Sequence, residues 1–92
     1  RWTSSIEDDR SISFRYFSPD GEDGFPGNVD VTVIYRLETD RRLIVEFRAE
    51  AKDKATPINL TNHTYFNLSG KENESIDEHF LQINADWYTP FD

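Results

Sequence analysis

The sequence predicts an all-β protein built on an antiparallel sheet. Three runs of residues alternate between apolar and polar side chains with a period of two, which is the pattern of a strand with one buried face. β-branched and aromatic residues are concentrated in these runs, and no segment has a convincing helical period. Short polar connections between runs favour antiparallel order.

The first predicted strand covers residues 12–16. Ile12, Phe14 and Tyr16 face one way, and the polar residues between them face the other. Residues 18–28 follow, and their three Gly and two Pro predict consecutive turns that no continuous strand can cross.

The second and third predicted strands cover residues 29–37 and 43–50. In both, apolar residues recur at every second position, beginning at Val29 and at Leu43. The connection at residues 38–42 is short and polar, so the two strands should pair as an antiparallel hairpin.

A fourth strand is predicted over residues 58–68 and a fifth over residues 80–83, with an extension towards Tyr88. The odd positions of the fourth strand should share one face, which consists almost wholly of hydrogen-bonding groups: Pro57, Asn59, Thr61, His63, Tyr65 and Asn67. Such a face suits either solvent or a hydroxyl-rich ligand such as a sugar.

Composition narrows the classes of partner. The 92 residues fit one small domain at most. The absence of Cys excludes disulfides and Cys-based zinc sites. It is also compatible with a cytoplasmic location, which we expect. Eighteen acidic against 10 basic residues give a net charge of −8, which disfavours nucleic acid or an anionic membrane surface as a partner. No apolar run approaches the roughly 18 residues of a membrane span.

His63 is the leading candidate for chemistry, because an imidazole can give or take a proton near neutral pH. An exposed strand face with a structural histidine is the alternative interpretation. His79, beside Glu78, is interpreted as structural or as a surface residue. Two distant histidines make no convincing metal site, since zinc needs three or four converging ligands.

Three motifs in order resemble galactose mutarotase, the aldose 1-epimerase family. They are Ser18–Val31, Asn59–Leu68, and Leu81–Asp86 followed by Tyr88–Pro90, and together they cover nearly the whole chain. The resemblance implies a β-sandwich that is part of an antiparallel supersandwich. It also implies a protein that binds a hexose such as galactose or glucose and interconverts its α and β anomers without cofactor or metal.

The resemblance further implies roles for three residues. His63 matches the family's general acid, which protonates the ring oxygen of the sugar while a glutamate removes the proton of the anomeric hydroxyl. Thr64 and Tyr65, which follow it in the motif, are the expected companions at the substrate. No Glu of this chain occupies a context that matches the family's base.

We expect residues 1–92 to form a single partial domain, an internal segment of an aldose 1-epimerase domain. The chain begins at Arg1 and contains no Met, and family members are several times longer. The family's H-G-G motif, its glutamate base, and the aspartate and glutamine that hold the sugar are all missing. The rest of the parent chain should complete the fold, and the isolated segment should be inactive.

Two other functions stay open at this stage. One is a non-catalytic carbohydrate-binding β-module, in which His63 and Tyr65 only grip a sugar. The other is a structural all-β interaction domain.

Overall fold

The computed structural model of the chain describes residues 1–71 and 73–90 and divides into two compact units. The first unit, Arg1–Asn62, contains a four-stranded sheet. The second unit, His63–Asp92, has neither helix nor strand in its described residues, 63–71 and 73–90. In the described part of the chain, no helix is long and apolar enough to cross a membrane.

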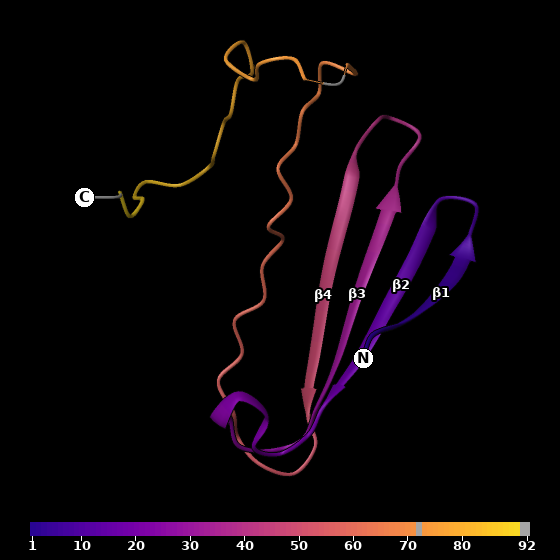
Figure 1. Ribbon diagram of the computed structural model, residues 1–92, viewed down its shortest axis with the longest axis vertical. Helices are drawn as coiled ribbons and strands as arrows, with labels where there is room; N and C mark the ends of the chain where they lie inside the picture. The colour runs from indigo at the N-terminus through magenta and orange to yellow at the C-terminus, as the bar shows by residue number, and fades with distance from the viewer. Residues whose placement is uncertain (72, 91–92) are drawn as a thin grey trace. The chain divides into compact units, whose positions relative to one another are not determined.

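The sheet of the first unit is antiparallel, with each strand paired to the next one in the sequence (Figure 1). Its strands are β1 (Thr3–Asp8), β2 (Ser11–Ser18), β3 (Val29–Leu37) and β4 (Leu43–Ala51). The predicted all-β class and antiparallel order are therefore confirmed for this unit. β2, β3 and β4 correspond to the three predicted strands, each within two residues at either end.

β1 escaped sequence-based prediction because only Ile6 among its six residues is a large apolar side chain. All six residues are exposed, so the strand has no alternating buried face. It forms because its backbone pairs with β2, with a register shift between Ile6 and Asp8. Hydrogen bonding to a neighbouring strand, rather than side-chain burial, defines this element.

The predicted hairpin of β3 and β4 is confirmed. Leu37 lies opposite Leu43 and Val33 lies opposite Phe47, so the apolar positions of the two strands coincide. The connecting turn is closed by the amide of Glu38, which donates to the carbonyl of Arg42 at 2.8 Å. Matching apolar positions set the register, because a slip of one residue would turn every side chain to the other face.

One face of the sheet is apolar, and the core of the first unit lies on it. Val29, Val31 and Val33 of β3 are each 8% exposed, and they are the only buried hydrophobic residues in the described part of the chain. The half-buried side chains that pack against them come from three strands: Tyr16, Tyr35 and Val45. The buried residues of the sheet thus come from its two inner strands, with Ser11 and Ser13 on β2 and the three valines on β3.

The chain after β4 runs beside this apolar face. Pro57, Ile58 and Leu60 line a cavity together with Phe25 and Val31. These contacts place the segment over the sheet face, and the outer edge of β4 has no partner strand in the described residues.

The predictions of strands over residues 58–68 and 80–83 are wrong: none of these residues is in a strand, and neither is the extension towards Tyr88. Alternation describes how side chains would face, but a strand exists only when its backbone pairs with another. Residues 58–62 lie in the first unit without joining its sheet. Phe80 and Leu81 are 100% and 85% exposed, so the later segment lacks the buried face of a sheet strand.

The loop between β2 and β3 is tied to the chain that follows β4 by polar contacts. The Lys54 ammonium lies 2.6 Å from the Asp20 carboxylate, and both the amide and the side chain of Asn28 donate to Asp53 at 2.7 and 2.8 Å. The Lys54 hydrogen bond and then the Gly27 amide lower the pKa of Asp20, because both favour its charged form. Two loops far apart in sequence are thus held together by side-chain hydrogen bonds.

A single 3₁₀ turn, η1 (Glu22–Gly24), lies within this loop. The Glu22 carboxylate accepts hydrogen bonds from the hydroxyls of Ser18 and Tyr16. These bonds hold the pKa of Glu22 below its usual value, and the bond from Ser18 has the larger effect. The hydrogen bond to Glu22 in turn raises the pKa of Tyr16. The carboxylate therefore anchors the turn to the end of β2.

Replacing Gly27 by alanine is expected to lower the free energy of unfolding of the intact protein by about 1–3 kcal/mol. Gly27 has a φ of +85°, and an added Cβ would lie 3.1 Å from both the Cβ and the carbonyl oxygen of Lys54. Gly21→Ala is the matched control, because Gly21 has a φ of +89° but no atom within 4 Å of an added Cβ. Chemical denaturation should show a larger loss for Gly27→Ala; equal losses would contradict a role for the Lys54 contact.

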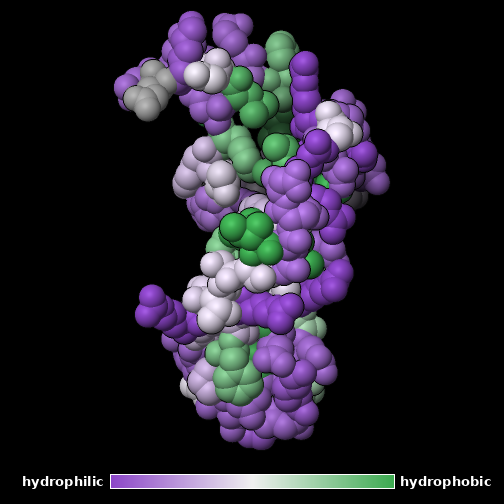
Figure 2. All heavy atoms as spheres, turned by 90° about the vertical axis from the view of Figure 1, so that its right-hand side faces the viewer, coloured by the Kyte–Doolittle hydropathy of each residue, from purple (hydrophilic) through white to green (hydrophobic). Residues whose placement is uncertain are grey.

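Exposed hydrophobic residues occur among the polar residues of the surface. On the face shown in Figure 2, hydrophilic residues predominate and hydrophobic residues form separate patches. In the second unit several large apolar side chains are exposed, including Trp87 at 90% and Tyr88 at 85%. Exposed aromatic side chains at this density are typical of a surface that another part of a protein covers.

Candidate functional site

The polar segment at residues 59–68 spans both units. Residues 59–62 end the first unit, and residues 63–68 begin the second. Each part has its own set of contacts and is described separately.

The first part is held by the apolar face of the sheet. Thr61 lines a cavity with aromatic and apolar residues from β2, β3, β4 and the start of the chain: Trp2, Phe14, Val33, Tyr35 and Phe47. The side-chain amide of Asn62 lies 3.5 Å from the hydroxyl of Tyr35. Tyr35 is in turn packed edge-on against Phe14, with ring centroids 6.0 Å apart. The residue that precedes His63 is therefore held by a side chain from β3.

His63 and Tyr65 are brought together in the second part. Their ring centroids are 5.1 Å apart, with an angle of 57° between the planes. Residues two positions apart in extended chain point to the same side, and the ring contact agrees with the expectation that these two share a face. Both side chains are exposed, Tyr65 at 88%. An imidazole that can donate or accept a proton thus lies beside an aromatic plane.

Thr64 lies between them in the sequence and is also exposed. Its hydroxyl can both donate and accept a hydrogen bond, as a hydroxyl-rich ligand requires. In the part of the chain that the structure describes, no three His, Cys, Asp or Glu side chains are grouped so that they could hold a metal ion. His63 can transfer a proton, and all three of His63, Thr64 and Tyr65 can form hydrogen bonds.

His79 holds the C-terminal end of the segment at residues 59–68, and this contact was not predicted from the sequence. The backbone amide of Leu68 donates to Nε2 of His79 at 2.8 Å. The side-chain amide of Asn67 donates to the carbonyl oxygen of Glu74 at 2.9 Å. The contact joins two ends of an irregular loop, and no local pattern in the sequence indicates such a partner. From the sequence, His79 could therefore be interpreted only as structural or as a surface residue.

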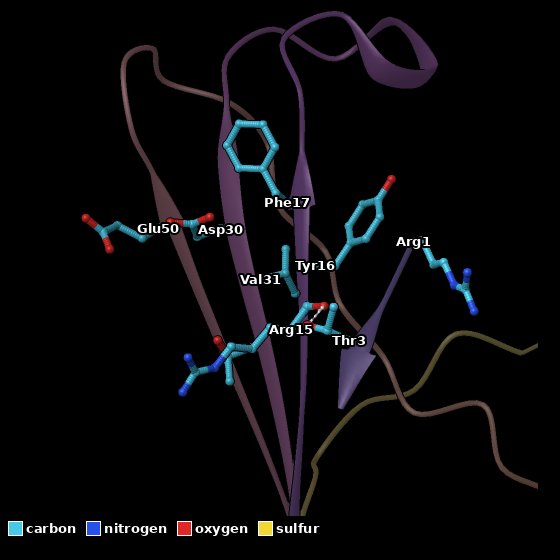
Figure 3. Close-up of a pocket in the computed structure, with 9 residues that line it drawn as sticks. Arg1, Thr3, Arg15, Tyr16, Phe17, Asp30, Val31 and Glu50 are labelled. Atoms are coloured by element: carbon cyan, nitrogen blue, oxygen red, sulfur yellow. Dashed lines mark hydrogen bonds between the residues drawn. The ribbon is translucent and has the colours of Figure 1, made fainter. Parts of the chain in front are cut away.

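Another hollow is lined by residues from all four strands of the sheet and contains none of the predicted site residues. Arg15, Tyr16 and Val31 are among the residues that line it, and the Thr3 hydroxyl donates to the Arg15 carbonyl at 3.4 Å (Figure 3). Its two carboxylates, Asp30 and Glu50, are each paired with the Lys52 ammonium at 2.8 Å.

Both pairs raise the pKa of Lys52, and the hydrogen bond to Asp30 has the largest effect. Because both of its carboxylates are already paired with Lys52 and it mixes residues from both faces of the sheet, we assign this hollow no part in the site.

The chain consists of an antiparallel sheet and, after it in the sequence, a segment rich in Asn and Thr that exposes a histidine and tyrosine pair. These features define a class: a β-sheet protein with a candidate site for a polar, hydroxyl-rich ligand. Comparison with protein families is more specific. The family model described as aldose 1-epimerase matches residues 1–92. The chain belongs to the aldose 1-epimerase family.

Individual relatives agree with this. The chain is 47% identical over 92 residues to an aldose 1-epimerase of Escherichia coli (strain K12), which covers 100% of this chain and 26% of the relative. It is 46% identical over 91 residues to a galactose mutarotase of Homo sapiens, covering 99% of this chain and 26% of the relative. An aldose 1-epimerase of Haemophilus influenzae is 47% identical over 93 residues, covering 100% and 27%.

The chain therefore spans about a quarter of the length of the curated relatives it matches. No solved structure matches it significantly.

Proposed function

We propose that this chain is an internal segment of an aldose 1-epimerase that interconverts the α and β anomers of a hexose such as galactose or glucose. The observation that carries the proposal is the segment Asn59–Leu68, with its exposed histidine and tyrosine pair, in a chain that matches the family along its whole length. Relatives that bear the name aldose 1-epimerase or galactose mutarotase support it.

In the proposed reaction His63 is the general acid. Its imidazolium gives a proton to the ring oxygen while a base removes the proton of the anomeric hydroxyl. The bond between C1 and the ring oxygen breaks, and the electron pair of the former O–H bond forms the C1 carbonyl. Rotation about C1–C2 presents the other face of the carbonyl, and the reverse transfers close the ring, so that no proton or electron is gained or lost overall.

The base comes from outside the 92 residues. The resemblance to the family implies a glutamate, and no glutamate of this chain lies in a matching context. The segment therefore supplies one half of an acid and base pair, and the reaction needs no metal or cofactor because both steps are proton transfers.

Tyr65 and Thr64 are proposed to bind the sugar beside His63. The ring contact between His63 and Tyr65 at 5.1 Å supports Tyr65 as the aromatic plane against which the apolar side of a hexose packs. The Thr64 hydroxyl is proposed to form a hydrogen bond with a sugar hydroxyl.

The remainder of the parent chain is proposed to complete a β-sandwich, part of a larger antiparallel supersandwich, from the single sheet of the first unit. The apolar side chains of the second unit support this: Phe80 is 100% exposed and Trp87 is 90% exposed. Covering them with further strands would bury area worth roughly 25 cal/mol per Å².

Polarimetry of freshly dissolved α-galactose or α-glucose tests the function. The intact protein is expected to bring the optical rotation to its equilibrium value faster than buffer alone, with a rate proportional to protein concentration. Buffer of the same composition without protein is the control, because mutarotation also proceeds spontaneously. A rate equal to that of buffer for every common hexose would overturn the proposal.

A non-catalytic carbohydrate-binding module is the second candidate. It is favoured by the exposure of His63 and Tyr65, since such a pair can grip a sugar without any proton transfer. Saturable sugar binding by the intact protein together with an unaccelerated mutarotation rate would establish the module instead of the enzyme.

A further inference from the structure

Leu68 ends the segment that carries His63, and its amide is the donor in a 2.8 Å hydrogen bond to Nε2 of His79. A backbone amide can only donate, so Nε2 of His79 must be without a proton. The proton of the neutral imidazole is then on Nδ1. The contact therefore selects one tautomer of this histidine.

His79 is itself held in place. Its backbone amide donates to the carbonyl oxygen of Ile76 at 2.9 Å, which fixes the turn that presents the ring. Among the described residues of the second unit, 63–71 and 73–90, His79 is the only one that is not exposed. Because packing contributes so little in this unit, hydrogen bonds decide where Leu68 lies.

A second set of contacts closes the same loop. The Asn67 side chain donates to the Glu74 carbonyl oxygen at 2.9 Å and accepts from the Ser69 amide at 3.0 Å. The backbone turns at Gly70 and Asn73, whose φ values of +73° and +63° are left-handed. Residues 67 and 68 are thus joined to residues 74 and 79, as in a compact surface loop whose ends are close.

We propose that His79 is a positioning residue for His63: by accepting the Leu68 amide, it fixes the C-terminal end of the segment at residues 63–68. The inference rests on the proposed role of His63 as general acid. Proton transfer depends steeply on geometry, and a displacement of about 1 Å can reduce a rate by a factor of about 100. On this proposal, loosening the chain at Leu68 transmits such a displacement to His63.

Two substitutions at His79 in the intact protein separate positioning from general structure. His79→Gln keeps an acceptor close to the place of Nε2, whereas His79→Phe keeps a planar ring and removes the acceptor. We expect His79→Phe to lower kcat at least about tenfold with a smaller change in KM, and His79→Gln to restore kcat to within about threefold of wild type. An unchanged kcat in His79→Phe, or equal losses in the two variants, would overturn the proposal.

Two measurements do not depend on catalysis. The amide of Leu68 should exchange with solvent at least about tenfold faster in His79→Phe than in wild type or His79→Gln. Nitrogen-15 NMR of the wild-type protein should show the His79 proton on Nδ1, and this measurement remains decisive if a variant fails to fold.

The two possible failures are distinguishable. A proton on Nε2 of His79, or a Leu68 amide that exchanges equally fast in all three proteins, would overturn the positioning role and leave the proposed function intact. Undiminished mutarotation in His63→Ala would instead overturn the general-acid role on which the inference rests.

Discussion

Replacing His63 by alanine in the intact protein is expected to slow mutarotation at least about a hundredfold, the usual loss when a general acid is removed. Alanine cannot protonate the ring oxygen, so ring opening would have to depend on water as the acid. The rate at saturating α-galactose, followed by polarimetry, measures the effect. Binding of the sugar should weaken much less, because Thr64 and Tyr65 remain.

Lys71→Ala is a suitable control for this experiment. Lys71 lies in the same unit and forms an exposed ion pair with Glu74 at 2.8 Å. Removing an exposed pair costs little, so the rate should stay within about twofold of wild type. A His63→Ala protein as active as the Lys71→Ala protein would exclude His63 as the general acid.

The 92 residues in isolation are expected to give no measurable acceleration of mutarotation. The segment contains the proposed acid but no glutamate in the context of the family's base, and paired acid and base action requires both. Moreover, His63 and Tyr65 are exposed, so water would surround a sugar at this site. Excluding water is part of what gives charged and polar groups their effect in catalysis.

The isolated chain and the intact protein should be compared by polarimetry at equal molar concentrations. Circular dichroism of the isolated chain, which should show the strands of the first unit, distinguishes a folded but inactive segment from an unfolded one. Acceleration by the isolated chain that His63→Ala abolishes would contradict the expectation and would place a base within these residues.

Sequence alternation predicted β2, β3 and β4 because each has one face that must be buried. In β3, Val29, Val31 and Val33 recur at every second position and are buried, and Phe47 of β4 lies opposite Val33. β1 was missed because its pairing with β2 involves backbone atoms and leaves its side chains exposed. Residues 58–68 were predicted wrongly because their alternation resembles that of a strand although no neighbouring strand pairs with them in the described chain.

In the candidate site, too, some features could be predicted from the sequence and others could not. The identity of His63 and its neighbour Tyr65 could be predicted from the motif, and so could their common side, because both depend on residue type and local spacing. The contact between Leu68 and His79 could not, since nothing in the spacing of an irregular loop shows where it closes. The contact of Asn62 with Tyr35 likewise joins residues that only the path of the chain over the sheet brings together.

By itself, the sequence determined the class of structure, the apolar face of each of three strands, the hairpin of β3 and β4, and the residue types available for proton transfer. All of these follow from the order of side chains over a few neighbouring positions. Only the tertiary structure decided that β1 joins the sheet, that residues 58–62 lie outside it, and that His79 accepts the amide of Leu68. Those outcomes depend on which backbone groups pair with one another, and a backbone donor or acceptor carries no sign in the sequence of the partner it will find.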